Sequence, residues 1–219
     1  MSDLLLSLPQ MYRNGEHLGI TSVCSAHPIV IEAALQLAKE SQKTVLIEAT
    51  CNQVNQDGGY TGMTPSDFRS FVEGIAHKVG LDETKIILGG DHLGPNPWKH
   101  LPAEAAMKKA EVMIEGYAKA GFTKLHLDTS MGCEGEPEAL PDEKTALRAV
   151  RLAKVAEANK GSNAPVYVIG TEVPVPGGAT HELDELELTK PESVAATYNI
   201  HKQAFEDAGL QEALSLIHI

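Results

Sequence analysis

Short apolar runs alternate with longer amphipathic segments five times along this 219-residue sequence. The short runs contain many β-branched residues, as expected of strands buried on both faces of a parallel sheet. No hairpin-type turn joins two runs, so the order predicts an α/β fold with parallel strands and right-handed helical crossovers. The predicted strands span residues 17–24, 44–51, 85–89, 124–128 and 166–170, and the predicted helices span residues 28–41, 65–79, 103–120, 142–159 and 191–208.

Two architectures accommodate five such units: a complete doubly wound sheet and part of a (β/α)8 TIM barrel. Segments with many polar and titratable residues follow the predicted strands, whereas most helix-to-strand connections are short and have few candidate functional residues. A barrel builds its site from its βα loops, while a doubly wound sheet uses mainly those at its switch point. We therefore expect one partial TIM barrel over residues 1–219, truncated after about five βα units. It would comprise a leading helix at 1–16, the βα units at 17–209, and a tail at 210–219 that looks like read-through at a broken gene end.

Composition excludes several classes of partner. The net charge is −12, from 30 acidic and 18 basic side chains, which argues against nucleic acid and anionic membranes as partners. No run approaches the roughly 18 apolar residues that span a bilayer, and the first residues lack the basic region of a secretory signal. Three cysteines without metal-like spacing are interpreted as reduced thiols. We therefore expect a cytoplasmic protein.

Two predicted strand ends carry acidic and imidazole groups. Asp91 and His92 follow the third strand, where they could serve in acid–base chemistry or bind a divalent metal, or simply cap and pack against the next turn. Asp128 ends the fourth strand, close to Ser130, and a carboxylate at an inner rim requires a partner. Because side chains alternate along a strand, His126 points the same way as Asp128, although a buried histidine satisfied by a neighbouring strand is the simpler interpretation.

Two further loops carry polar residues or glycines suited to a sugar. Asn52 and Gln53 belong to an amide-rich segment after the second strand, suited to hydroxyl recognition unless it is only a hydrophilic surface loop. Glu172 follows the fifth strand, and Gly177 and Gly178 permit close approach of the backbone to a ligand. Together, these loops favour a polyol or ketose substrate handled by proton transfer, with or without a metal.

Four segments carry a family resemblance: GGDHLGPNPW, LHLDTSM, GTEVPVPGGA and EATCNQVNQDGGYTGMTP. The chain resembles, over about residues 3–210, the accessory (non-catalytic) subunit of class II D-tagatose-1,6-bisphosphate aldolase. The resemblance implies a role in tagatose, galactitol and N-acetylgalactosamine catabolism, with a catalytic class II aldolase subunit as partner and a sugar phosphate as ligand. A more distant likeness to class II aldolases implies Asp91 as proton donor and His92 as ligand of zinc or a similar divalent metal.

The same likeness matches Asp128 and Ser130 to an Asp-x-Ser element, and Glu172 to a site glutamate. Family members continue to roughly twice this length, so the phosphate-binding loops of the later strands are expected outside this chain. Three functions remain open. They are an accessory subunit that stabilises the aldolase, a metal-assisted ketose 6-phosphate 4-epimerase acting on tagatose or fructose 6-phosphate, and an inactive fragment whose open strand edges reduce its solubility.

Overall fold

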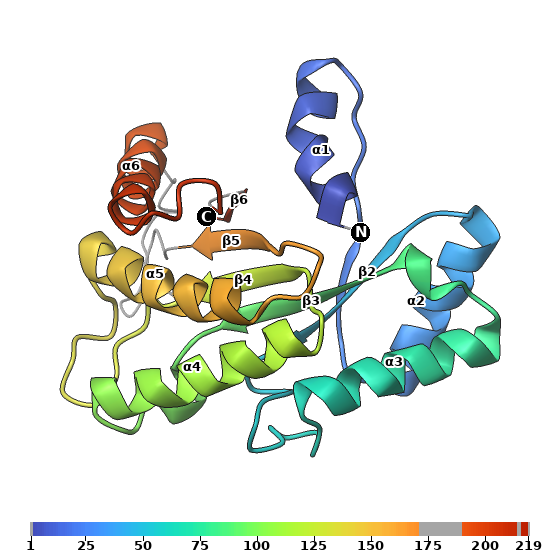
Figure 1. Ribbon diagram of the computed structural model, residues 1–219, viewed down its shortest axis with the longest axis horizontal. Coiled ribbons are helices and arrows are strands. Elements are labelled where there is room, and N and C mark those ends of the chain that lie inside the picture. The colour runs from blue at the N-terminus through green and yellow to red at the C-terminus, as the bar shows by residue number, and fades with distance from the viewer. Residues whose placement is uncertain (1, 171–189, 214–215, 219) are drawn as a thin grey trace, which may run out of the picture.

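A parallel sheet with its strands in sequential order, β1 to β6, forms the centre of the molecule (Figure 1). The structure, a computed structural model, describes residues 2–170, 190–213 and 216–218. The strands are β1 (Ser22–Cys24), β2 (Val45–Thr50), β3 (Ile86–Leu93), β4 (Lys124–Asp128), β5 (Val166–Gly170) and β6 (Leu216–His218). The helices are α1 (Ser2–Arg13), α2 (Pro28–Ser41), α3 (Pro65–Val79), α4 (Ala103–Lys119), α5 (Asp142–Asn159) and α6 (Pro191–Asp207), with short 3-10 helices η1 (Glu83–Lys85) and η2 (Asn96–Trp98).

The sequential strand order confirms the predicted α/β class and its barrel-like arrangement. A doubly wound sheet reverses its strand order at a switch point and carries helices on both faces. Here each strand pairs in parallel with the next strand along the chain. Repeated right-handed crossovers then place the connecting helices on one face, as in the wall of a barrel.

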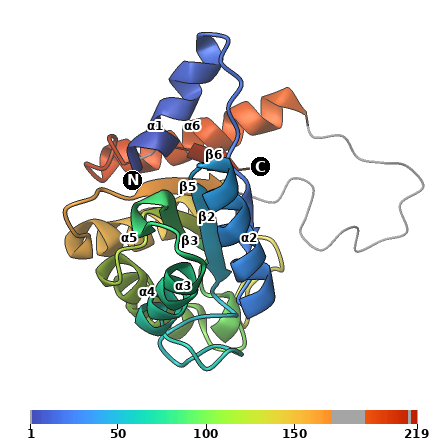
Figure 2. The same ribbon diagram turned by 90° about the vertical axis from the view of Figure 1, so that its right-hand side faces the viewer.

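Two hydrophobic clusters lie on opposite faces of the sheet. The larger cluster joins outward-facing strand residues such as Ile47 and Leu127 to the connecting helices, including Phe205 of α6. The smaller cluster packs Leu5 of α1 against Leu46, Ile87 and Val166, which lie near the amino ends of their strands. Figures 1 and 2 show α1 across the sheet from α3 and α4. The inner face is therefore apolar at the amino ends of the strands, which leaves polar chemistry to the carboxyl ends.

Local signals in the sequence predicted the ends of α3 well. Thr64 and Asp67 form a reciprocal capping box at its start, and Gly80 ends it in the left-handed conformation. At the start of α2, Nδ1 of His27 accepts a hydrogen bond from the backbone N–H of Ile29. His27 therefore acts as the N-cap residue of α2.

Two predicted strands differ from the structure by more than one residue at an end, and a sixth strand was not predicted. β1 is confined to Ser22–Cys24, and β3 continues to Leu93 rather than ending at residue 89. A sixth strand, β6, lies in the segment interpreted as a tail, and its His218 is in register with Gly170 of β5. Among the described helices, none has the length and apolar character needed to cross a membrane.

Candidate functional site

A bulge near the end of β3 positions the first two candidate residues. Pairing with β4 shifts register between Gly90 and Leu93, and His92 has a φ of 47°, which L-residues rarely adopt. Asp91 lies opposite Thr50 of β2, inside the strand. The expected loop location of Asp91 and His92 was therefore wrong. A β-bulge lets strand pairing continue past polar residues while it redirects their side chains.

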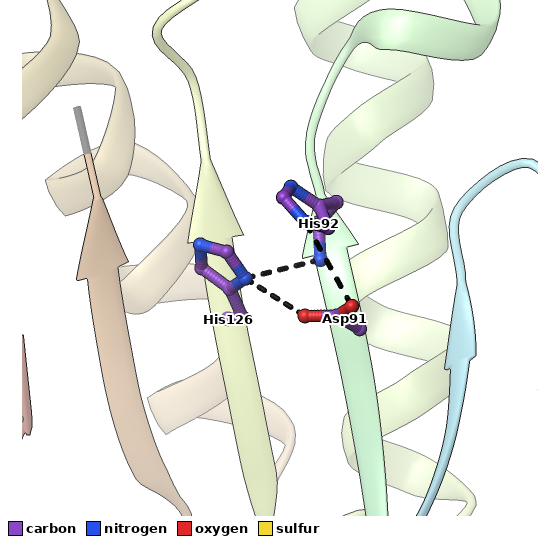
Figure 3. Close-up of side chains that lie close together, drawn as sticks. All are labelled: Asp91, His92 and His126. Atoms are coloured by element: carbon purple, nitrogen blue, oxygen red, sulfur yellow. Dashed lines mark hydrogen bonds and ion pairs between the residues drawn. The ribbon is translucent and has the colours of Figure 1, made fainter. Parts of the chain in front are cut away.

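Asp91, His92 and His126 form a compact cluster between β3 and β4 (Figure 3). Nδ1 of His126 lies 2.9 Å from Oδ1 of Asp91, and Nε2 of His92 lies 3.8 Å from Oδ2 of Asp91. The two imidazole rings are 4.6 Å apart between centroids. His126 is buried and bonded to a neighbouring strand, as the simpler interpretation predicted. That neighbour, however, is Asp91 itself, so His126 belongs to the candidate site.

The charge of Asp91 decides the tautomer of His126. Burial alone would raise the pKa of Asp91, but the bond with His126 and the electrostatic attraction of the neighbouring His92 and Lys124 side chains hold the pKa well below its usual range. Burial lowers the pKa of His126, which favours the neutral imidazole. The backbone N–H of His92 also points at Nδ1 of His126, but at 3.3 Å. The shorter bond, to a charged acceptor, is the stronger, so Nδ1 of His126 carries the proton and donates a hydrogen bond to Asp91.

A second carboxylate orients His92. Nδ1 of His92 lies 2.9 Å from Oδ2 of Asp128, the last residue of β4. Oδ1 of Asp128 accepts hydrogen bonds from the hydroxyl and the backbone N–H of Ser130, at 2.9 and 3.3 Å. Burial would raise the pKa of Asp128, but the bonds from His92 and Ser130 outweigh burial and lower it. Because an ionised Asp128 can only accept this hydrogen bond, the proton of His92 lies on Nδ1. The ionised Asp91 places the proton of His126 on Nδ1 in the same way.

This arrangement suits a divalent cation. Asp91, His92 and His126 each offer one potential ligand atom within 4.8 Å of the others. Histidines that bind metals commonly donate their second ring N–H to a carboxylate, which fixes the tautomer and the ring orientation. Here both Nδ1 atoms make such a bond, and each neutral ring then presents Nε2 in the unprotonated form that a metal requires.

Sequence reasoning missed an ion pair on the inner face of the sheet. Nζ of Lys124 lies 2.5 Å from Oε1 of Glu48 and 3.9 Å from Oδ1 of Asp91. Burial raises the pKa of Glu48 despite this neighbour. The sequence did contain a signal that Lys124 belongs near the site: every second residue of β4 points to the same face, and these residues are Lys124, His126 and Asp128. Their strand partners could not be inferred from β4 alone.

The remaining predicted residues have other placements. Asn52 is exposed, and the Oε1 atom of Gln53 accepts a hydrogen bond from the backbone N–H of Thr50 at 2.8 Å, within the loop after β2. Among the described residues, no hydrogen bond joins either of them to Asp91. The predicted residues Glu172, Gly177 and Gly178 lie outside the described part of the chain.

Comparisons with known proteins identify relatives of this chain. The chain is 51% identical over 220 residues to a D-tagatose 6-phosphate 4-epimerase of Agrobacterium fabrum, covering 99% of this chain and 52% of the relative. It is 53% identical over 209 residues to a D-tagatose-1,6-bisphosphate aldolase subunit GatZ of Escherichia coli, covering 94% of this chain and 50% of the relative. It also resembles a solved structure, a probable tagatose 6 phosphate kinase from Sinorhizobium meliloti. That match has a TM-score of 0.79 and 61% identity, and covers 90% of this chain and 46% of the other.

The chain thus spans about half the length of the curated relatives that it matches. A single family model covers almost all of it, from residue 5 to residue 218. The family is described by its model as D-tagatose-1,6-bisphosphate aldolase subunit GatZ/KbaZ-like. On this match, and on its identity to these relatives, the chain belongs to the GatZ/KbaZ-like family.

Proposed function

We propose that the protein is a metal-assisted ketose 6-phosphate 4-epimerase that interconverts D-tagatose 6-phosphate and D-fructose 6-phosphate. The observation that carries the proposal is the pair of histidines, His92 and His126, each held at Nδ1 by an ionised carboxylate. A subunit that only stabilises a partner has no need of this arrangement. The 51% identity to an enzyme named as such an epimerase supports the same choice.

The reaction inverts C4 without an external oxidant. A base removes the proton of the C4 hydroxyl, and the C3–C4 bond breaks as its electrons move toward the C2 carbonyl. The products are the enediolate of dihydroxyacetone and glyceraldehyde 3-phosphate. Rotation of the aldehyde exposes its other face, so re-formation of the bond and return of the proton give the epimer. His92 and His126 would hold a divalent cation that polarises the ketose carbonyl.

Within this scheme, Asp91 is the residue we assign to the proton. Its Oδ1 orients His126, and we assign its Oδ2, which lies 3.8 Å from Nε2 of His92, to the proton of the substrate hydroxyl. Its low pKa keeps it ionised at neutral pH, the state in which it can accept a proton. Both oxygens of Asp128 are engaged with His92 and Ser130, which suits an orienting role rather than proton transfer.

The test is conversion of D-tagatose 6-phosphate to D-fructose 6-phosphate, followed through a coupled dehydrogenase. We expect turnover by the protein, loss of turnover with a chelator, and recovery with zinc. Asp91→Asn and His92→Ala should each lower kcat about 100-fold or more, since both groups act at the reacting atoms. His77→Ala, a change at an exposed residue of α3, is the matched control. Turnover that is unchanged in Asp91→Asn would refute the residue assignment.

A second candidate is an accessory subunit of a class II tagatose-bisphosphate aldolase. It is favoured by the 53% identity to proteins named GatZ subunits of that aldolase. It predicts that the protein raises the melting temperature and activity of a catalytic aldolase subunit. Asp91→Asn separates the two roles, because a purely stabilising subunit should retain its full effect when this carboxylate is neutralised. No effect of the wild-type protein on any class II aldolase tested would remove this candidate.

A further inference from the structure

A buried ion pair crosses the middle strand of the site. Glu48 belongs to β2 and Lys124 to β4, and the register places both beside Gly89 of the intervening β3. The side chains of Glu48 and Lys124 are 2% and 13% exposed. Burying two charges is costly, because their mutual attraction must offset the hydration that both ions lose. A fold that needed only packing would place apolar side chains here.

The absence of a side chain at residue 89 makes the ion pair possible. A Cβ at Gly89 would lie 2.5 Å from Oε1 and 2.8 Å from Cγ of Glu48. Glu48 cannot readily yield, because it is buried and already bonded to Lys124. Gly89 therefore opens the space in which the carboxylate of Glu48 and the ammonium of Lys124 meet across β3.

Asp91 follows Gly89 by two residues on β3, so its side chain lies on the same face of the sheet as the ion pair, next to it along the strand. Nζ of Lys124 is 3.9 Å from Oδ1 of Asp91, the oxygen that accepts the bond from His126. Lys124 thus lies between two carboxylates. Glu48 holds the ammonium group in place, and the positive charge of Lys124 also attracts the Asp91 carboxylate.

We propose that Lys124, anchored by Glu48 in the space above Gly89, is a positioning residue that holds the Asp91 carboxylate against His126. Through Asp91 it keeps the proton of His126 on Nδ1, so that Nε2 faces the site. The proposal deepens the epimerase hypothesis, on which its catalytic consequence rests. Its structural consequence, the tautomer of His126, does not depend on turnover.

The structural test is the one-bond 1H–15N NMR signal of His126 Nδ1–H in the protein as purified, assigned by its loss in His126→Gln. We expect the signal in the wild type and its weakening or loss in Lys124→Met, because Asp91 loses a cationic neighbour. Lys78→Met, an exposed change on α3, should leave the signal unchanged. If Lys124→Met does not fold, Glu48→Gln provides the test, since it keeps the lysine but removes its charged anchor.

The kinetic test separates positioning from binding. We expect Lys124→Met to lower kcat about 10- to 100-fold, with KM changed by less than about twofold, as for residues that orient ligands of a site. Lys124→Arg, which keeps the charge, should recover part of the loss. An unchanged Nδ1–H signal in both Lys124→Met and Glu48→Gln would overturn the proposal. Failure of the wild type to turn over ketose phosphates would refute the epimerase hypothesis alone, because the NMR signal still reports the tautomer.

Discussion

Nδ1 of His92 lies 2.9 Å from Oδ2 of Asp128, and this bond joins the bulged end of β3 to the last residue of β4. Without it, nothing in the strand geometry requires His92 to present Nε2 to the site. We therefore expect Asp128→Asn to weaken binding of a divalent cation by about 10- to 100-fold. The measurement is calorimetric titration of the metal-free protein with zinc.

Asp207→Asn, an exposed change in α6, is the control for that titration and should leave the zinc affinity unchanged. Equal zinc affinity in Asp128→Asn and the wild type would mean that the bond from Asp128 does not prepare His92 to hold the cation. Weaker affinity with an unchanged thermal unfolding curve would place the effect in the site rather than in the fold.

Gly94 brings the loop after β3 into close contact with the end of β4. A Cβ at this position would lie 1.6 Å from the carbonyl oxygen of Asp128, a backbone atom that cannot rotate away. Gly94→Ala should destabilise the protein by about 2 kcal/mol and disturb Asp128. Gly74→Ala is the matched control, since nothing lies within 4 Å of its Cβ and the residue is inside α3. It should stabilise the protein by up to about 1 kcal/mol in urea denaturation.

Glu136, in the loop after β4, should make the free energy of unfolding depend on pH in the acidic range. Its carboxylate accepts hydrogen bonds from Lys144, from the Cys133 backbone N–H, and from Arg148 at both oxygens. Burial opposes the shift, but these bonds lower the pKa of Glu136 from 4.5 to about 2. Because the pKa is depressed in the folded state, the stabilisation is present above the unfolded value and is lost as pH falls through the folded value.

Glu136→Gln should therefore cost about 3 kcal/mol of unfolding free energy at pH 7, since it leaves the buried Arg148 without its charged partner. The difference from the wild type should shrink as pH falls from about 4.5 to about 2. Chemical denaturation at a series of pH values measures it. Glu143→Gln is the control, because this residue is exposed and lies on α5, the helix that also carries Arg148. A difference that stays constant over this pH range would contradict the prediction.

The capping box of α3 gives a local prediction. Oγ1 of Thr64 accepts a hydrogen bond from the backbone N–H of Asp67 at 3.3 Å, and Oδ2 of Asp67 accepts one from the backbone N–H of Thr64 at 3.0 Å. Thr64→Ala should lower the free energy of unfolding by about 1 kcal/mol. Ser66→Ala, an exposed change in the same turn, should stay within about 0.5 kcal/mol. Equal losses in the two variants would show that the cap contributes nothing specific.

The sequence by itself determined the alternation of strands and helices, the bounds of β4, β5 and α5, and the capped ends of α3. These features are local: apolar periodicity and capping residues act over a few neighbours, so a window of sequence contains their causes. The extension of β3 could not be predicted in this way, because its bulge depends on pairing with β4. β6 was missed for a similar reason, since its three residues gain their strand conformation by pairing with β5.

The candidate site was predicted as a set of residue types, but the tertiary structure decided which of them meet. Asp91 and His92 could be identified from their place near the end of a strand, whereas the partners of each could not. The register of β3 against β4 brings His126 to Asp91 and Asp128 to His92. Together with the register of β2 against β3, it brings Glu48 to Lys124 across Gly89. These partners belong to segments tens of residues apart, so the pattern within one strand does not identify the residue that lies opposite on the next.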